Sequence, residues 1–355
     1  MNSKERVLTT LANSEPDRVP INYMANGGID SRLKSYFKLS QDDHEGLLET
    51  LQVDFRVVGA PYIGSRLHPE VSGRNVDPAY GIRTRWIQHE SGGYWDFCDF
   101  PLEFATLEEV KAWPMPSPDG FDYSRPAKEC DRNKEYFVIT YCHPDIINST
   151  GMIRGMEQTL VDLATNDPAG ITYIDRKLEI QLEVLRRTLE AANGGIDAVW
   201  LGEDLGTQHS PMISLDLFRR QIRSRHQPFI DLAKHYGAHV FMHSCGSSSW
   251  AFDDFIEMGV TVVDTLQPEA KDMSPEYLKS RFGGRLGFHG CISTGGPVAY
   301  GTVDDVIESC KQTLDVMMPG GGYCFAPTHA LQDNSPTENV VAMYKTAQEY
   351  GRYNR

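Results

Sequence analysis

The sequence predicts a single (β/α)8 TIM barrel over residues 1–355, and three observations favour this fold class. Short β-branched or apolar runs alternate with amphipathic stretches along the chain, as expected for a parallel sheet covered by helices. These runs number eight, which is the number of strands in a closed barrel of this kind. A chain of 355 residues with 40% hydrophobic and 10% aromatic residues can bury a full core, and α/β barrels of this length fold as one domain.

Each predicted strand is short and is followed by a segment with helical periodicity. The eight predicted strands are residues 18–24, 53–60, 137–142, 198–203, 239–245, 260–267, 286–293 and 323–329. Among the helices, 178–193 carries leucines on one face and stops at two consecutive glycines, which are common helix terminators. The last helix is predicted to begin at a capping box formed by Ser335 and Glu338, with Pro336 at the first helical position.

One segment, residues 81–102, interrupts the alternation. Its sequence, GIRTRWIQHESGGYWDFCDFPL, has the two-residue period of a β-hairpin around Gly92-Gly93. We interpret it as an insertion at the mouth of the barrel, between the second and third strands. No internal repeat or low-complexity linker divides the chain, so we expect no domain boundary.

Charge and composition exclude several classes of partner. The chain has 34 Lys and Arg against 49 Asp and Glu, a formal net charge of −15, which repels phosphate backbones and anionic lipid. We therefore expect no nucleic-acid or membrane partner. No apolar run approaches the ~20 residues of a membrane-spanning helix, and the start lacks a signal-peptide core. We expect a cytoplasmic protein whose seven scattered cysteines are reduced thiols.

Barrel enzymes carry their chemistry at the C-terminal ends of the strands, and here these ends are rich in potential metal ligands. The residues are Cys142 and His143, Glu203 and Asp204, His243 and Cys245, Asp264, His289 and Cys291, and Cys324 with His329. In a strand, residues i and i+2 point to the same side, so His243 and Cys245 can face one ion. Cys324, after three glycines, would complete an N,S,S set that suits Zn²⁺ and leaves a position open for substrate. On spacing alone, two buried cysteines and a hydrogen-bonded core histidine explain these residues equally well.

Four segments resemble the uroporphyrinogen decarboxylase superfamily. They are RVLTTLANSEPDRVPI, GEDLGTQHSPMIS, HVFMHSCGSSS and GGGYCFAPTHALQDNSPTENVVAMYKTAQEYG. The resemblance covers almost the whole chain outside the hairpin insertion and implies a (β/α)8 barrel. True decarboxylases of the superfamily have an RQAGRY segment after the first strand and an aspartate after the second. Here MANGGI and GAPY stand in those places. Without the arginines, the charges of a polyanionic tetrapyrrole would be unpaired, so we reject the decarboxylase activity.

The chain is more similar to the zinc methyltransferases that work with corrinoid proteins, such as the coenzyme M methyltransferases and the anaerobic O-demethylases. Their zinc motif is H-x-C followed, roughly eighty residues later, by a cysteine, and Cys324 comes 79 positions after Cys245. The resemblance implies that His243, Cys245 and Cys324 act through a bound zinc ion. No corrinoid-binding D-x-H-x-x-G motif occurs in the chain, so a separate partner protein would carry the corrinoid.

A fourth zinc ligand is suggested by a second resemblance. Cobalamin-independent methionine synthase has a similar zinc set with a glutamate in the following strand, and the matching position here is close to Asp264. Glu203 and Asp204 are competing candidates. The alternative for Asp264 is a structural carboxylate that is hydrogen-bonded to loop amides.

The resemblance predicts a methyltransferase of the EC 2.1.1 type whose methyl donor is a small methylated substrate. Zinc could activate an ether or alcohol oxygen as a Lewis acid, or hold a substrate thiol as its thiolate. The segment GEDLGTQHS favours O-demethylation of a methyl ether, and rings at the mouth suggest that the ether is aromatic. The residues predicted to contact substrate are Tyr23, Glu203, Gln208, His289 and His329.

Three alternatives stay open at this stage. The first is a methylcorrinoid:thiol methyltransferase similar to the coenzyme M enzymes. The second is a metal-free enzyme that uses the carboxylates at the strand ends, for instance as a decarboxylase of a smaller acid. The third is a non-catalytic member of the superfamily, because fold does not determine function. The zinc hypothesis predicts that Cys245→Ala and Cys324→Ala each lose metal and activity together.

Overall fold

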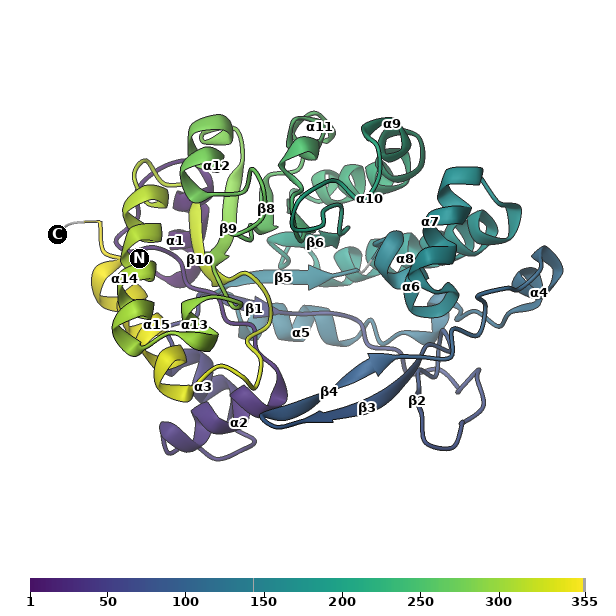
Figure 1. The fold of residues 1–355 in the computed structure, drawn as a ribbon, viewed down its shortest axis with the longest axis horizontal. Helices are drawn as coiled ribbons and strands as arrows, with labels where there is room; N and C mark the ends of the chain where they lie inside the picture. Colours follow the sequence, from purple (N-terminus) through teal and green to yellow (C-terminus); the bar gives the residue numbers. More distant parts are fainter. Residues whose placement is uncertain (143, 354–355) are drawn as a thin grey trace.

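A curved sheet of seven parallel strands forms the centre of the molecule (Figure 1). The computed structural model describes residues 1–142 and 144–353, so the predicted strand-end residue His143 lies outside the described residues. The strands, in spatial order, are β1 (Phe55–Val57), β5 (Phe137–Tyr141), β6 (Ala198–Gly202), β7 (His239–Ser244), β8 (Val262–Thr265), β9 (Gly287–Ile292) and β10 (Tyr323–Pro327). Seven of the eight predicted strands are thereby confirmed, with shorter bounds.

The remaining predicted strand, residues 18–24, is an extended segment with isolated bridges. It closes the barrel between β10 and β1. On one side, Phe325 N donates to Pro20 O at 2.8 Å and Asn22 N donates to Phe325 O at 2.9 Å. On the other side, Asp54 N donates to Ile21 O at 2.8 Å. A regular ladder does not form because Pro20 has no N–H to donate.

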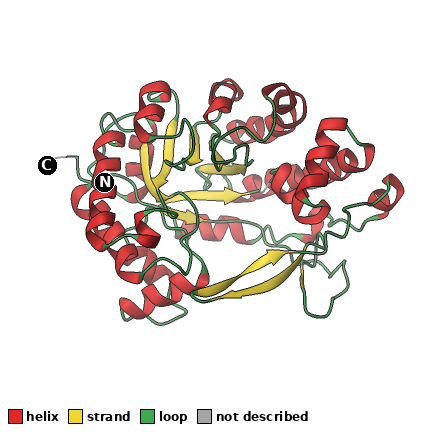
Figure 2. Ribbon diagram, viewed as in Figure 1, coloured by secondary structure: helices red, strands yellow, loops and turns green. Residues whose placement is uncertain are grey.

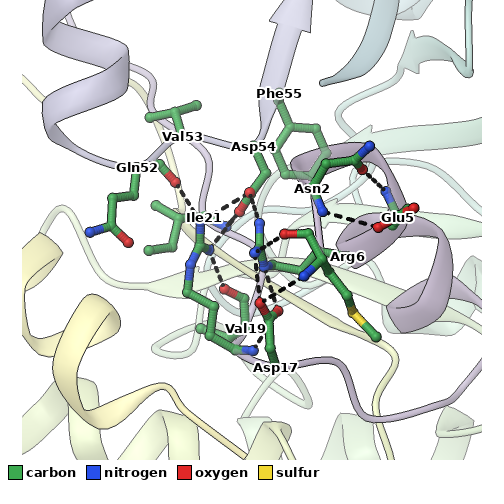
Figure 3. Close-up of polar contacts among 12 residues, drawn as sticks. Asn2, Glu5, Arg6, Asp17, Val19, Ile21, Gln52, Val53, Asp54 and Phe55 are labelled. Carbon is green, nitrogen blue, oxygen red and sulfur yellow. Dashed lines mark hydrogen bonds and ion pairs between the residues drawn. The ribbon is translucent and has the colours of Figure 1, made fainter. Parts of the chain in front are cut away.

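Charged side chains reinforce this closure at the N-terminal end of the strands (Figure 3). The carboxylate of Asp54, just before β1, is fully buried and accepts from Arg6 Nη1 and Arg18 Nη1, each at 2.7 Å. It also accepts from the backbone N–H of Ile21 at 2.8 Å. Arg6 makes a second, bidentate contact with Asp17. The buried carboxylate therefore joins the first helix, the closing segment and β1.

Helices surround the sheet (Figure 2). They are α1 (Ser3–Leu11), α2 (Gly27–Tyr36), α3 (His44–Thr50), α4 (Leu107–Ala112), α5 (Arg125–Arg132), α6 (Ile147–Arg154), α7 (Met156–Thr165), α8 (Pro168–Ala192), α9 (Leu215–Leu217), α10 (Ser224–His235), α11 (Phe252–Met258), α12 (Pro275–Phe282), α13 (Pro297–Tyr300), α14 (Val303–Met317) and α15 (Thr337–Tyr350). Within the described residues, no helix combines the length and the apolar character needed to cross a bilayer.

Two helix starts show how local sequence positions these elements. Helix α8 starts ten residues earlier than predicted, because Asp167 caps it by accepting from the backbone N–H groups of Ala169 and Gly170. The capping box predicted at Ser335 and Glu338 does not form. Pro336 occupies the N-cap position of α15, and the Ser335 hydroxyl is buried without a partner among the described residues.

The predicted hairpin insertion is confirmed, and it stands apart from the barrel sheet (Figure 2). Strands β3 (Arg83–His89) and β4 (Gly92–Phe97) pair antiparallel, and the short β2 (Asn75–Val76) adds to β3. The turn lies two residues earlier than the predicted glycine pair. At the tip, Gly92 has φ 155° and packs against the loop after β10, where an added Cβ would lie 2.2 Å from Asp333 Oδ2. The hairpin tip thus reaches the C-terminal side of the barrel.

Candidate metal centre

Three potential metal ligands converge at the C-terminal ends of β6 and β7. His243 is the fifth residue of β7, Cys245 follows its last residue, and Asp204 lies two residues after β6. One ligand atom from each of these side chains lies within 4.8 Å of the others. Among the described residues, no other set of three His, Cys, Asp or Glu side chains meets this criterion. The strand periodicity that brings His243 and Cys245 to one side is as predicted.

The spacing of these ligand atoms fits a tetrahedral zinc ion. His243 Nε2 lies 3.4 Å from Cys245 Sγ and 3.5 Å from Asp204 Oδ1. Zinc bonds of about 2.0 to 2.3 Å at tetrahedral angles separate neighbouring ligand atoms by about 3.3 to 3.6 Å. Nitrogen, sulfur and carboxylate oxygen are all common zinc ligands. The donor types and the two separations from His243 Nε2 therefore suit zinc.

The carboxylates of Asp204 and Asp264, on either side of the His243 imidazole, also favour a bound cation. Burial opposes a charge on His243, but hydrogen bonds with Asp204, Asp264 and Cys245 raise its pKa well above the ordinary value. Burial would raise the pKa of Asp204 as well, yet its hydrogen bond with His243 lowers the pKa overall. Asp204 is further held by the backbone N–H of Cys245 at 2.8 Å and by Asn148 Nδ2 at 2.7 Å. A bound dication at Nε2 would take the place of the imidazolium proton in neutralising these carboxylates.

Asp264 orients the His243 ring through a hydrogen bond at Nδ1. Its Oδ2 lies 2.6 Å from His243 Nδ1, so Nδ1 is occupied and Nε2 faces Asp204 and Cys245. A carboxylate on the second ring nitrogen is the usual support of a histidine ligand. Burial alone would raise the pKa of Asp264, but the imidazoles of His289 and His243 lower it to about 2. Both oxygens of Asp264 thus contact imidazole nitrogens, and its predicted role as a fourth ligand stays a prediction.

Comparison with known proteins places this centre in a family. A family model described as uroporphyrinogen decarboxylase (URO-D) matches residues 147–350, which is more than half of the chain and includes all three converging residues. The chain belongs to the URO-D family. No curated protein matches the chain.

Among solved structures, a methyltransferase from Methanosarcina mazei resembles this URO-D family chain along its full length. The two share 16% sequence identity with a TM-score of 0.63, over 99% of each chain, a likeness that shows the common barrel fold. Two partial matches have lower TM-scores. A B12-independent methionine synthase from a Shewanella species, in complex with selenomethionine, is 8% identical with a TM-score of 0.38, over 64% of this chain and 67% of that one. Native xylanase 10B from Thermotoga maritima is 12% identical with a TM-score of 0.41, over 66% and 82%.

The structure of this URO-D family member does not place Cys324 in the group formed by Asp204, His243 and Cys245. Cys324 is the second residue of β10, fully buried and near the N-terminal end of the strand. It pairs in register with His289, which pairs with Asp264, which in turn pairs with His243. Barrel strands tilt, so this hydrogen-bonded row descends from the mouth at β7 towards the opposite end at β10. Burial raises the pKa of the Cys324 thiol, and the charge of Asp54 raises it further. Cys324 is thus not among the side chains that converge here, which are Asp204, His243 and Cys245, and the His–Cys–Cys set stays a prediction.

Three of the residues predicted to contact substrate make hydrogen bonds to other residues of the protein. Glu203 is buried, and its two oxygens accept from the backbone N–H groups of Ile146 and Ile147, where α6 starts. His289 lies in the barrel core, held between Asp264 Oδ1 at 2.6 Å and Asn22 Nδ2 at 3.0 Å. Tyr23 turns towards the helices, with its hydroxyl 3.4 Å from Asp30 Oδ1 in α2.

The other two predicted contacts remain available at the mouth. Gln208, in the loop after β6, exchanges side-chain hydrogen bonds with Gln267 in the loop after β8; Gln208 is exposed and Gln267 is half-buried. His329 is exposed after the end of β10, with Nδ1 3.2 Å from the carbonyl of Ala330. A substrate contact at either residue stays a prediction.

Sequence reasoning missed two polar side chains that support the centre. Asn148 holds Asp204 from α6, and the Thr265 hydroxyl lies 2.8 Å from His243 Nδ1. Thr265 has φ 83°, a conformation that β-branched residues rarely adopt. Such strain persists where the surroundings impose it, and it clusters at functional sites. No local pattern in the sequence marks a strained threonine, so only the folded chain reveals it.

We predict that Asp264→Asn lowers the zinc affinity of the protein by about 10- to 100-fold, the usual cost of losing the partner of a histidine ligand. Asparagine keeps the shape of the side chain but removes the charge that orients His243. Competition with a chromophoric chelator measures the affinity. The matched control is Thr265→Val, which removes only a neutral hydrogen bond from the same ring nitrogen and should weaken binding less. Equal affinity in Asp264→Asn and the parent would contradict the orienting role.

Proposed function

We propose that this chain is a zinc-dependent methyltransferase that moves a methyl group from a small methylated substrate, such as a methyl ether, to a corrinoid on a partner protein. The observation that carries the proposal is the convergence of Asp204, His243 and Cys245 at the C-terminal mouth of the barrel. The full-length likeness to a Methanosarcina mazei methyltransferase supports it. We further propose a cytoplasmic location, where reducing conditions keep all seven cysteines as free thiols.

Each of the three side chains would contribute one ligand atom to zinc. Asp204 and the Cys245 thiolate supply negative charge, and His243 supplies a neutral nitrogen that Asp264 keeps in the right orientation. Zinc has four positions in such sites, so three protein ligands leave one for substrate. When bound, zinc would act as a Lewis acid on the substrate oxygen. The His243 side chain is 27% exposed, so the centre can be reached from the mouth.

The proposed reaction balances as a displacement at carbon. The carbon–oxygen bond of the ether breaks, and the oxygen leaves with the bonding electrons and then takes a proton from solvent. The corrinoid of the partner protein would supply, from Co(I), the electron pair that accepts the methyl group. The corrinoid would approach the open mouth on its own protein, because the chain has no corrinoid-binding D-x-H-x-x-G motif. The reverse transfer, from methylcobalt to a thiol, is the competing direction and needs the same zinc centre.

Zinc content is the test of the proposed centre. We expect about one zinc per chain in the untagged parent and in Cys324→Ala, and little in Cys245→Ala, because only Cys245 adjoins His243 and Asp204. Elemental analysis of the three purified proteins measures it, and circular dichroism checks that each is folded. A parent that takes up no zinc even when metal is supplied would end the proposal. Loss of zinc from Cys324→Ala would restore the His–Cys–Cys set that the sequence predicted.

A further inference from the structure

The hairpin insertion exposes four aromatic side chains. Trp86, Tyr94, Trp95 and Phe97 are 48%, 48%, 52% and 38% exposed. Trp86 and Trp95 are paired across β3 and β4, with ring centroids 5.5 Å apart, and Phe97 follows on the same face of the hairpin. Tyr94 lies on the opposite face. Exposed apolar side chains that gather in this way mark a surface that contacts a partner.

Strand β4 has an open edge. The order of the small sheet is β2-β3-β4, so β4 pairs with β3 on one side only. Cys98 N donates to Arg83 O at 3.0 Å, and hydrogen-bonded pairs alternate with non-bonded pairs along an antiparallel ladder. Counted from this pair, the backbone N–H and C=O groups of Gly93, Trp95 and Phe97 point away from β3. Within the described residues, no backbone group outside the hairpin pairs with them.

The edge of β4 also lacks the features that keep sheet edges from pairing. Native edges are protected by Lys or Pro, by β-bulges, or by charges that point inward. The sequence of β4, GGYWDF, contains neither Lys nor Pro, and its register with β3 is unbroken along the whole strand. Its one charged residue, Asp96, is half-buried and lies 3.6 Å from the guanidinium of Arg85 on β3. A regular edge with exposed aromatic side chains is suited to pairing with another strand.

We propose that two copies of this chain associate through their β4 strands, which pair antiparallel about Trp95 and join the two small sheets into one. A two-fold axis makes such an interface self-complementary. In this register Trp95 pairs with Trp95 of the second copy, and Gly93 pairs with Phe97, so all three outward-facing residues of each edge are hydrogen-bonded. A slip of two residues in one direction places Phe97 opposite the turn. A slip in the other direction places Asp96 opposite a second Asp96, and like charges in that position are destabilising.

The side chains fit the same register. Trp86 and Trp95 of the two copies would form a continuous row of four indoles across the joined sheet. Gly93 is buried against the Trp86 ring, because an added Cβ would lie 2.3 Å from Trp86 Cζ2, so Phe97 of the second copy would meet that ring. On the other face, Asp96 stands opposite Tyr94, and no two like charges face one another. Association through β4 does not depend on the proposed zinc chemistry.

The interface of this dimer is small. A fully buried aromatic side chain covers about 150–250 Å², so four rings that are about half exposed contribute roughly 300–500 Å² per copy. Interfaces of this size are typical of weak, reversible association. Each copy carries a formal charge of −15, which opposes association, and salt screens this repulsion. We therefore expect the dissociation constant of the dimer to fall as the salt concentration rises.

Sedimentation equilibrium as a function of protein concentration tests the proposal. We expect the parent to form a reversible dimer. Trp95→Lys should raise the dissociation constant at least tenfold, because it removes the central indole of both copies and places two ammonium groups opposite each other. The matched control is Phe104→Lys, which adds the same charge at a side chain that is 82% exposed and lies outside the hairpin. It should dimerise as the parent does, and circular dichroism checks that both variants are folded.

Cross-linking tests the register. In Trp95→Cys the two introduced cysteines form a directly opposed pair with Cα atoms about 5.5 Å apart, within reach of a disulfide. In the control Tyr94→Cys they are diagonal neighbours about 7–8 Å apart, which is too far. After oxidation, a non-reducing gel should show a covalent dimer for Trp95→Cys but not for Tyr94→Cys or the parent. A parent that stays monomeric at all concentrations, a Trp95→Lys variant that dimerises as Phe104→Lys does, or cross-linking of Tyr94→Cys alone would each overturn the proposal.

Discussion

Replacing Asp54 with alanine should lower the free energy of unfolding by about 3–5 kcal/mol, the usual cost of removing one partner from a buried ion pair. The substitution leaves the guanidinium groups of Arg6 and Arg18, which are 7% and 9% exposed, without their shared carboxylate. It also leaves the backbone N–H of Ile21 without its acceptor. These hydrogen bonds are lost at the segment of residues 18–24, where isolated bridges close the barrel in place of a regular ladder.

Urea denaturation followed by circular dichroism measures this effect. The matched control is Asp17→Ala, which removes the other carboxylate on Arg6. The Asp17 side chain is 46% exposed, and an exposed ion pair contributes only about 0–1 kcal/mol. If Asp54→Ala does not accumulate as folded protein, Asp54→Asn, which keeps the hydrogen-bonding shape, gives the measurable value. An Asp54 variant as stable as Asp17→Ala would show that the network does not hold the barrel closed.

The second large effect is expected at His243. His243→Ala should reduce the rate of methyl transfer to a Co(I) corrinoid by roughly a thousandfold or more. A Lewis-acid metal supplies several kcal/mol of transition-state stabilisation, and each 1.36 kcal/mol is a factor of ten in rate. The alanine removes a proposed ligand and leaves Asp204 and Asp264 facing one another without the imidazole between them.

Transfer from a small methyl ether to a free corrinoid, followed by the absorbance change at cobalt, measures this rate. His235→Ala is the control, because His235 is exposed at the end of α10, just before β7, on the side of the barrel away from the mouth. It should transfer methyl groups at the parental rate. If His243→Ala loses activity but keeps its full complement of zinc, the imidazole serves the reaction without holding the metal, and the ligand assignment would be wrong.

The sequence by itself determined the alternation of strands and helices, because buried parallel strands must be apolar and the helices that cover them amphipathic. It also determined that His243 and Cys245 lie on one side of β7, since their i, i+2 spacing on a strand is purely local. The hairpin followed from its two-residue period. The irregular closing segment could have been anticipated from Pro20, whose missing N–H is a local property.

Only the tertiary structure decided which residue joins His243 and Cys245. Cys324 matched by its distance along the chain, but it is the second residue of its strand, whereas His243 is the fifth residue of β7. Asp204, beyond the end of β6, reaches the pair because neighbouring parallel strands end at the same edge. The tilt of the strands carries residues in register to different heights in the barrel, and no pattern of spacing in the sequence records that tilt.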